Sequence, residues 1–387
     1  MKHTLTAITA LLTAIPALAD PVAVHTWTRM EWNLPAEAEA AAQEARIWER
    51  APLAGIEGAP DGTLFVSTPR WIDPAVPATF SRVGEDGMLT PWPSLEAHDL
   101  SNPVAIRNAL GAFVTSDGIL WLMDMGWVAG EDVAPEGAQK LLGFDLATGE
   151  EIARIILDDV APRDTSFLND LVIDETRGIA ILTDSGNRGG APVPAALIVV
   201  DLETGAIRRI LDGHPALSDD PQRRLVVDGV EVFPGNRLAV GVNGITLSAD
   251  GETLWFSMTT GDAIRSVPMD LVADPLTEPE MLAAAVSEPS RIGGGSDGLA
   301  TDPTGRVWIT NLALNRVEVM APGSTQTDIL FEGGDFVWPD SLATDFSGGM
   351  LLSTNRLNSA FSGQLDYDGD DVNFAIWRIP ADMAPSR

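Results

Sequence analysis

The chain has 387 residues, no cysteine, and 56 acidic side chains against 24 basic ones, which gives a formal net charge of −32 at pH 7. A surface this acidic repels phosphate backbones and anionic lipid headgroups, so the composition argues against nucleic acid and anionic membranes as partners. A chain of this length can bury a core large enough to fold without disulfides, and we expect a monomer.

The first nineteen residues have the composition of a secretory signal peptide. Lys2 supplies the positive end, residues 5–18 are mostly apolar, and Ala17 and Ala19 form an A-x-A cleavage pattern. The apolar run is too short to span a bilayer, and no other stretch stays apolar for about 18 residues. We therefore expect residues 1–19 to be removed, a mature protein that is secreted or periplasmic, and no membrane insertion.

Two elements are expected before the repetitive part of the chain. Residues 23–27 alternate between apolar and polar like a short strand. Residues 35–50 are rich in Ala and Glu, begin with Pro35, and carry Arg46 and Arg50 near the end, so their charges match a helix dipole. We expect one short N-terminal helix over 35–50, as a decoration on the fold, and no other clear helix.

From Leu53 onward one β unit recurs. In the copy at residues 296–311, Asp297 and Gly298 open a short apolar strand, a tight turn follows at 302–305, and a second strand follows the turn. A strand, a glycine-containing turn and a strand predict a hairpin. Similar units begin at or near Glu57, Pro103, Asn169, Asn243, Asp297 and Asp340. Six copies of a β unit predict an all-β fold, a six-bladed β-propeller.

A second repeat marks the outer half of each blade. Residues 141–157 and 197–211 each contain a strand, an Asp-x-x-Thr-Gly turn and another strand, so each blade should have four strands. The corresponding third strands of the last three blades are expected at 263–268, 316–320 and 375–379. The long loops are expected at 186–194, 212–224 and 270–295. We predict one domain over residues 20–387, because blades cannot bury their faces alone.

Large aromatic residues fall at one place in the repeat. Trp121, Trp255 and Trp308 each follow a turn glycine by three or four residues, and Phe65 occupies the same place. We interpret these side chains as core between blades and not as a cage around a ligand.

The starts of the repeats carry polar residues that should meet around the channel, because the innermost strand of each propeller blade lines it. The expected ring contains Glu57, Asn169, Asn243, Asp297 and Asp340. Carboxylate and amide oxygens are hard donors of the kind that calcium prefers. The alternative is local turn chemistry, because Asp and Asn before Gly often bond their own backbone.

Several stretches resemble the yellow/major royal jelly protein family. They include residues 67–71 (Ser-Thr-Pro-Arg-Trp), 76–79, 89–94, 120–126, 140–146, 244–248 and 254–256. The resemblance implies a six-bladed propeller, secretion, and a ligand pocket at one end of the channel, where we place Asp340, Arg70 and Trp71. It links insect members to chemistry around dopachrome and to binding of biogenic amines. Insect members also carry disulfides, which this chain lacks, so it resembles a bacterial lineage and the insect biology is not carried over.

A wider resemblance is to gluconolactonase, regucalcin and paraoxonase propellers. These hold calcium in the channel with an acidic residue of the first blade and with Asn and Asp residues of later blades. The resemblance implies Glu57, Asn169, Asn243 and Asp297 as metal ligands here, with Asp297 also able to act as a catalytic base. The paraoxonase-type histidine pair has no counterpart, because the mature chain contains only His25, His98 and His214.

Two functions remain open at this point. One is a secreted binding protein that takes a small molecule in the channel, with a divalent cation. The other is a calcium-dependent lactonase or esterase-type hydrolase, in which the metal polarises a carbonyl group and Asp297 activates water. A tautomerase-like activity is also compatible with the resemblance. Propellers host binders and enzymes alike, so the fold does not choose between them.

Overall fold

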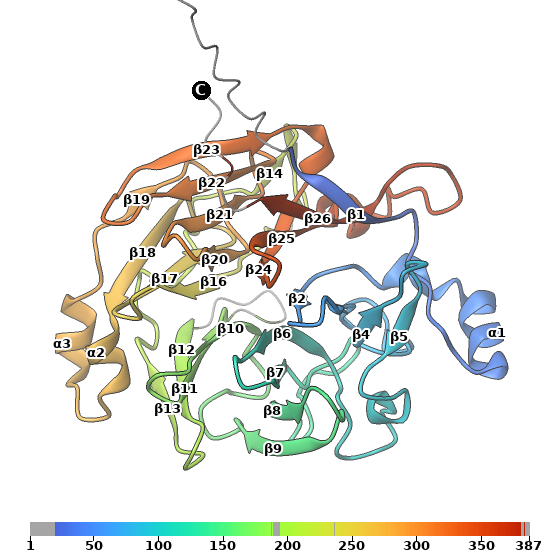
Figure 1. The fold of residues 1–387 in the computed structure, drawn as a ribbon, viewed down its shortest axis with the longest axis horizontal. Helices are drawn as coiled ribbons and strands as arrows, with labels where there is room; N and C mark the ends of the chain where they lie inside the picture. Colours follow the sequence, from blue (N-terminus) through green and yellow to red (C-terminus); the bar gives the residue numbers. More distant parts are fainter. Residues whose placement is uncertain (1–19, 187, 189–193, 236, 381–382, 384–387) are drawn as a thin grey trace, which may run out of the picture.

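Six four-stranded antiparallel sheets surround a central channel in the computed structural model (Figure 1). The structure describes residues 20–186, 188, 194–235, 237–380 and 383, so the expected signal peptide lies outside the described residues. The predicted six-bladed propeller with four-stranded blades is confirmed.

Each blade runs from an inner strand at the channel to an outer strand at the rim. The first three blades are β2 (Ile56–Gly58), β3 (Leu64–Ser67), β4 (Phe80–Val83) and β5 (Leu89–Pro91); β6 (Ala109–Val114), β7 (Ile119–Asp124), β8 (Lys140–Asp145) and β9 (Glu151–Ile156); and β10 (Leu168–Asp174), β11 (Ile179–Asp184), β12 (Ala196–Asp201) and β13 (Ile207–Ile210).

The next two blades are β16 (Val242–Leu247), β17 (Thr253–Met258), β18 (Ala263–Pro268) and β19 (Ser290–Arg291); and β20 (Leu299–Thr301), β21 (Val307–Asn311), β22 (Arg316–Met320) and β23 (Thr327–Glu332). The sixth blade contains β24 (Pro339–Asp345), β25 (Gly349–Thr354), β26 (Phe374–Pro380) and, as its outer strand, β1 (Val22–Trp27). The pairing of β1 with β26 closes the ring of blades, since it joins the two ends of the chain in one sheet.

The N-terminal helix is shorter than the sequence predicts. α1 covers Ala36–Ala45, Arg46 then adopts a left-handed conformation with φ of 48°, and a 3-10 turn follows at Ile47–Arg50. The reason is burial: α1 has no buried residue, whereas Ile47 and Trp48 are buried and must turn toward the core.

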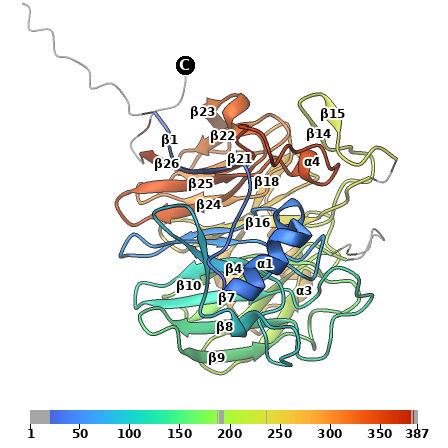
Figure 2. The ribbon, with the colours of Figure 1, turned by 90° about the vertical axis from the view of Figure 1, so that its right-hand side faces the viewer.

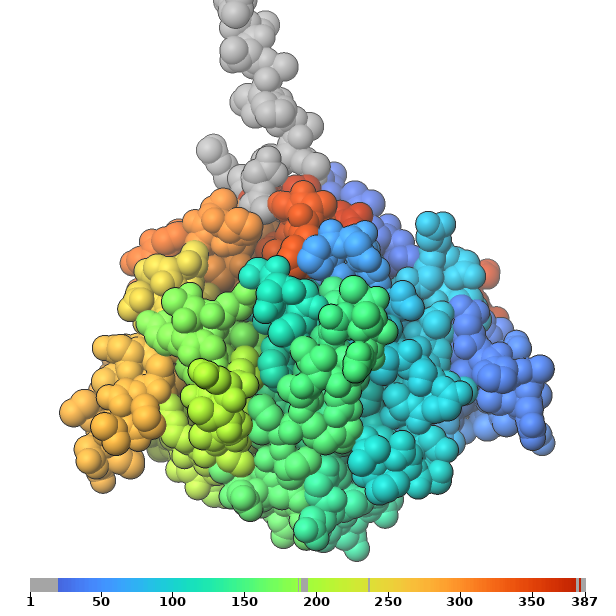
Figure 3. All heavy atoms as spheres, turned by 60° about the horizontal axis from the view of Figure 1, so that its bottom comes forward, coloured from blue at the N-terminus to red at the C-terminus, as the bar shows by residue number. Residues whose placement is uncertain are grey.

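The expectation of a single helix and of a loop over 270–295 is wrong. This segment contains α2 (Met269–Ala273), α3 (Pro279–Ala284) and the short outer strand β19. α2 and α3 project from the rim of the propeller, away from α1 (Figure 3). Further helical turns lie at Glu96–His98, at Gly334–Phe336 and at α4 (Leu357–Ala360).

One face of the propeller carries an additional hairpin, β14 (Val226–Val227) and β15 (Val230–Glu231). It lies on the same face as α4 (Figure 2). Leu225, Val227 and Val232 join Trp338 and Leu357 in one apolar cluster. Because Trp338 and Leu357 also line the channel cavity, the hairpin packs beside the channel mouth.

The core lies between neighbouring blades. Trp121 and Trp308 are buried, and Trp308 packs with residues of blades 5 and 6, so the interpretation of these two tryptophans as core is confirmed. Trp255 is only half-buried at the edge of another cluster, which makes it a weaker core residue than expected.

Replacing Trp308 with Ala should lower the free energy of unfolding by about 3–5 kcal/mol, the cost of deleting a large buried aromatic side chain. The indole also donates a hydrogen bond of 2.8 Å to Asp302, which Ala cannot replace. Urea denaturation measures the loss.

Trp255→Ala is the matched control and should cost less, because Trp255 is partly exposed already. A Trp308→Ala protein as stable as the wild type would contradict this account of the core.

Candidate functional site

The channel contains a cavity of about 870 Å³ that is lined by residues of all six inner strands. The inner strands follow each other around it in the order β2, β6, β10, β16, β20, β24 (Figure 1). At one end lie the starts of these strands, and at the other end lie exposed residues such as Ser116, Glu175 and Phe346.

The pairing of several inner strands is irregular where they enter the sheet. In four blades, the register between the inner strand and the second strand shifts just after the first residue of the inner strand. These inner strands are β6, β10, β16 and β24. Two successive residues therefore leave the regular ladder, as in a β-bulge, and their side chains can be aimed into the channel.

Hydroxyl groups of the second strands bond the backbone at these strand entries. Three of these hydroxyl groups accept a hydrogen bond from a backbone N–H of their own blade. Thr183 accepts from Asp170 at 2.9 Å. Thr310 accepts from Gly298 at 2.9 Å, and Ser353 accepts from Ser341 at 3.0 Å. Two act on the next blade: Ser257 donates to the Ser296 carbonyl at 3.3 Å, and Ser67 donates to the Leu110 carbonyl at 2.5 Å. The repeated Ser or Thr thus satisfies backbone groups that lie outside the ladder.

The strand entries bring four of the predicted residues to equivalent places. We call the six equivalent positions the ring: Ala54, Leu110, Asn169, Asn243, Asp297 and Asp340. The polar part of the ring comes from blades 3 to 6, and the apolar part comes from blades 1 and 2.

Hydrogen bonds fix the ring side chains. Asn243 Nδ2 donates to Asp297 Oδ1 at 2.9 Å and to Thr259 at 2.8 Å, and the Trp338 indole donates to Asp297 Oδ2 at 2.7 Å. Asp340 accepts from Asn355 at 2.6 Å and from Ser341 at 2.9 Å.

Glu57 does not belong to the ring, which corrects the sequence alignment of blade 1. Ile56 pairs with Val66 in blade 1 in the same way that Leu299 pairs with Ile309 in blade 5. Asp297 lies two residues before Leu299, so its equivalent in blade 1 is Ala54, two residues before Ile56. Glu57 follows Ile56 and lies farther along the channel, where it lines the cavity and is buried. The weak repeat of this blade caused the error, because its ring position has no polar side chain.

Asp170 is a channel residue that the sequence interpretation missed. It immediately follows a ring position, where blades 4 and 5 have Gly244 and Gly298. A Cβ atom at Gly244 would lie 2.7 Å from the Asp297 carbonyl oxygen, and one at Gly298 would lie 2.3 Å from that of Asp340. Four blades have glycine at this position and blade 6 has Ser341, so a carboxylate there was the available signal.

Aromatic side chains surround the cavity at the end where the inner strands begin. We call them the collar: Trp71, Trp127, Phe167, Phe233, Trp338 and Phe361. Trp71 lies 5.8 Å from Phe167 and 6.4 Å from Phe361 between ring centroids, and Phe233 lies 5.3 Å from Phe361. Trp71, which the sequence analysis placed in the pocket, thus lies in the cavity wall.

Arg70 does not line the cavity, in contrast to the prediction. Its guanidinium group is buried and donates to the carbonyl oxygens of Val76, Pro77, His98 and Arg107 at 2.9–3.2 Å. These bonds hold the backbone that presents Trp71, so Arg70 supports the pocket without facing it.

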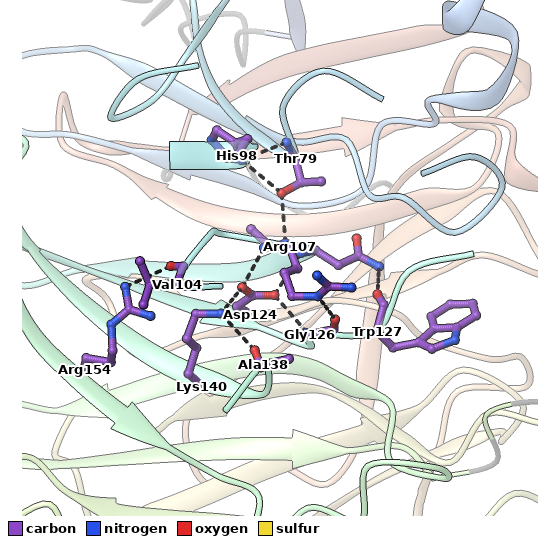
Figure 4. A network of polar contacts seen from close by, with 12 residues as sticks. Thr79, His98, Val104, Arg107, Asp124, Gly126, Trp127, Ala138, Lys140 and Arg154 are labelled. Carbon is purple, nitrogen blue, oxygen red and sulfur yellow. Dashed lines mark hydrogen bonds and ion pairs between the residues drawn. The ribbon is translucent and has the colours of Figure 1, made fainter. Parts of the chain in front are cut away.

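A buried ion pair supports the same region (Figure 4). Lys140 Nζ lies 2.7 Å from Asp124, which also accepts from the backbone N–H groups of Arg107, Asn108 and Gly126. Burial alone would raise the pKa of Asp124, but the Lys140 charge and these donors hold it below its ordinary value.

Asn108 connects the ion pair to the collar. Its side-chain oxygen accepts from the Arg70 N–H at 2.8 Å, and its amide group donates to the Trp127 carbonyl at 2.6 Å. Since Asp124 holds the Asn108 backbone, the ion pair fixes the segments that carry Trp71 and Trp127.

Comparison with known proteins decides the family. The sequence model of the major royal jelly protein family matches residues 109–386. The chain belongs to the major royal jelly protein family. No curated protein sequence matches the chain.

Solved structures similar to this major royal jelly protein share the propeller fold. A gluconolactonase from Xanthomonas campestris has a TM-score of 0.50 at 14% identity, and the match covers 95% of this chain and 99% of the other. A luciferin-regenerating enzyme has a TM-score of 0.50 at 12% identity, and the match covers 88% of this chain and 95% of the other. A putative gluconolactonase has a TM-score of 0.50 at 15% identity, and the match covers 87% of this chain and 91% of the other. Identities this low show the fold alone.

Two further findings bear on the sequence predictions. No helix in the described ranges is long and apolar enough to cross a membrane. Within the same ranges, no three His, Cys, Asp or Glu side chains are grouped so that they could hold a metal ion. The predicted calcium ligands that share the ring are one carboxylate, Asp297, and two amides, Asn169 and Asn243, with Asp340 as a second carboxylate.

The electrostatics of the channel favour bound protons or a bound cation. Burial raises the pKa of Asp297 to about 6 and the pKa of Asp170 to about 7, where the Asp297 charge adds to the effect. Burial, followed by the charges of Asp297 and Asp170, raises the pKa of Asp340 well above its ordinary value. Burial, with a contribution from Asp170, does the same for Glu57. The cationic lining residues in the described part of the chain are Arg188 and Arg237.

Stability should fall with rising pH because of Asp170, and Asp170→Asn should remove that part of the fall. The unfolded carboxyl releases its proton near pH 4, whereas the folded one keeps it up to about pH 7, so its contribution is complete at low pH and is lost as pH rises. The stability of the variant relative to wild type should therefore rise from pH 4 to 7, by about 1.4 kcal/mol for each pH unit at most.

Urea denaturation of both proteins across this range provides the measurement. Glu203→Gln, at an exposed turn carboxylate, serves as the control for the loss of one negative charge. A constant or falling difference for Asp170→Asn would contradict the buried-acid account.

Proposed function

We propose that this major royal jelly protein binds a small organic cation in its channel: an amine with an aromatic or apolar body. The observation that carries the proposal is the pairing of the aromatic collar with the carboxylates of Asp170, Asp297 and Asp340 in one cavity.

The charges in the cavity favour an ammonium group. Ionising the buried carboxylates is costly, as their raised pKa values indicate, and a cation among them offsets that cost. An ammonium group can donate up to three hydrogen bonds, and bonds between two charged partners are the strong ones.

The collar suits the body of such a ligand. Faces of Trp and Phe attract organic cations and stack with aromatic rings. The cavity volume of about 870 Å³ falls within the range of small-molecule pockets, about 300–1,000 Å³.

The proposal includes an extracytoplasmic location. It rests on the signal peptide pattern of residues 1–19, with Lys2 ahead of an apolar run and Ala17 and Ala19 at the cleavage site.

Phenethylamine is a suitable probe, and 2-phenylethanol is its neutral counterpart of similar size. Calorimetric titration of the wild type near neutral pH should show binding of the amine and little binding of the alcohol. Asp297→Asn or Asp340→Asn should weaken amine binding by about tenfold or more, because each removes one charged hydrogen-bond partner.

Glu175→Gln is the matched control, because Glu175 also lines the cavity but lies at its exposed far end. Equal affinity for amine and alcohol, or ring variants that bind the amine like wild type, would contradict the proposal.

A divalent cation is the second candidate occupant, and calcium is the ion that we propose. Asp297 and Asp340 supply carboxylate oxygens, Asn169 and Asn243 can supply amide oxygens, and these hard donors suit calcium. The position of Glu57 outside the ring weakens this candidate relative to the amine.

Bound calcium should raise the melting temperature by mass action, and a chelator should lower it. Asn169→Ala and Asp297→Ala should abolish the response, while Glu203→Ala should keep it. A melting curve of metal-stripped wild type that does not move at millimolar calcium would contradict a calcium site.

A calcium-dependent lactonase or esterase is the alternative function. Asp297 supports it, because a carboxylate with a pKa of about 6 is mostly ionised at neutral pH and can accept a proton. The hydrolase needs the metal as its Lewis acid, so this alternative depends on the outcome of the calcium experiment. The amine proposal does not depend on that outcome.

A further inference from the structure

Trp338 has an unusual conformation next to the ring. It is a buried tryptophan with φ of 50°, in the left-handed region that few residues other than glycine adopt. Its indole N–H donates to Asp297 Oδ2 at 2.7 Å. Backbone strain of this kind persists only where the surrounding structure enforces it, and it occurs often at functional sites.

Asn315 enforces this conformation from another segment of the chain. Its side-chain oxygen accepts from the Trp338 backbone N–H at 3.3 Å. Its amide group donates to Asp228 Oδ1 at 2.5 Å. Asn315 and Asp228 also have left-handed φ values, 48° and 52°.

Asp228 lies at the turn of the β14–β15 hairpin beside the channel mouth. Val227 of this hairpin is buried in the same apolar cluster as Trp338. A continuous set of contacts therefore leads from the hairpin through Asn315 and Trp338 to Asp297, and on to the Asn243 amide.

We propose that Trp338 is a positioning residue that orients Asp297 for the ligand, and that the β14–β15 hairpin acts on the ring through Asn315 and Trp338. This inference rests on the proposed function and adds the device that sets the affinity of the channel for its cation.

The geometry explains how the indole acts. A carboxylate oxygen has two acceptor positions, and the Trp338 N–H occupies one of them on Oδ2, which fixes the rotation of the carboxylate. The ligand then meets an oriented acceptor, and less ordering is needed when it binds. Without the indole N–H, the Asp297 side chain keeps its contacts with Asn243 and Thr259, but Oδ2 loses the donor that Trp338 supplies.

Trp338→Phe separates this role from packing, because Phe keeps an aromatic ring in the cluster and removes the N–H. We expect phenethylamine to bind about tenfold more weakly, the effect of losing one hydrogen bond to a charged group. A purely structural role would lower the melting temperature and leave the affinity of the folded protein unchanged.

The indole resonance of Trp338 in the nitrogen-15 NMR spectrum reports directly on the hydrogen bond that its N–H donates to Asp297. It is assigned by its loss in Trp338→Phe. The indole resonance should shift in Asp297→Asn and in wild type saturated with phenethylamine. It should also shift in the Asp228→Gly protein without ligand.

Asp228→Gly tests the hairpin at a distance from the ligand, and Gly suits the left-handed backbone at this position. It should weaken phenethylamine binding about fivefold, a usual size for coupling between sites. Glu231→Gln is the matched control in the same hairpin, because Glu231 pairs with the exposed Arg224 and not with Asn315.

The outcomes distinguish the two proposals. Wild type that fails to bind phenethylamine overturns the proposed function. Wild type that binds it, with Trp338→Phe and Asp228→Gly binding equally well, overturns the role of Trp338 and the hairpin. An indole resonance unmoved by Asp297→Asn or Asp228→Gly overturns that role whatever the ligand does.

Discussion

Inner strands of this propeller enter their sheets through short breaks in pairing, and hydroxyl groups of the second strands hold the backbone there. The constraint is that buried backbone groups must form hydrogen bonds. A bulge in a buried sheet takes N–H and C=O groups out of the ladder, and these groups need other partners. Thr183 and Ser353 accept from such N–H groups in blades 3 and 6. Because the entries lie at equivalent positions, residues of separate blades form one ring, and no loop has to fold over the channel to bring them together.

The ring is asymmetric, and the proposed function depends on that asymmetry. Ala54 and Leu110 leave one side apolar, while Asp297 and Asp340 come from successive blades on the other side. Two acids so close, with Asp170 within their field, cannot all ionise without a counter-charge. The collar at the strand starts supplies aromatic surface, and the buried ion pair of blade 2 holds its backbone. The cavity therefore combines acidic side chains with an aromatic mouth.

The architecture could be predicted from the sequence because a repeated strand, turn and strand reports the blades directly. The partner of β1 could not be predicted, since Ala23 pairs with Trp377 at the other end of the chain and such a pairing leaves no local pattern.

The ring could be predicted only in part. Blade 1 has no polar residue at its ring position, so the sequence pattern points to the nearest acid, Glu57. In blade 3, Asn169 already fills the ring position, so the repeat gives no reason to expect its neighbour Asp170 in the channel as well. The contacts of Trp338 join distant segments, and no local pattern reports them.

A crystal structure of the protein with phenethylamine bound would show which groups of the channel hold the amine. We expect the ammonium nitrogen to lie within hydrogen-bonding distance of Asp297 or Asp340, about 2.7–3.2 Å, with the phenyl ring against the collar. A ligand at the far end of the channel near Glu175, or one with its nitrogen directed away from the ring carboxylates, would contradict the proposed binding mode.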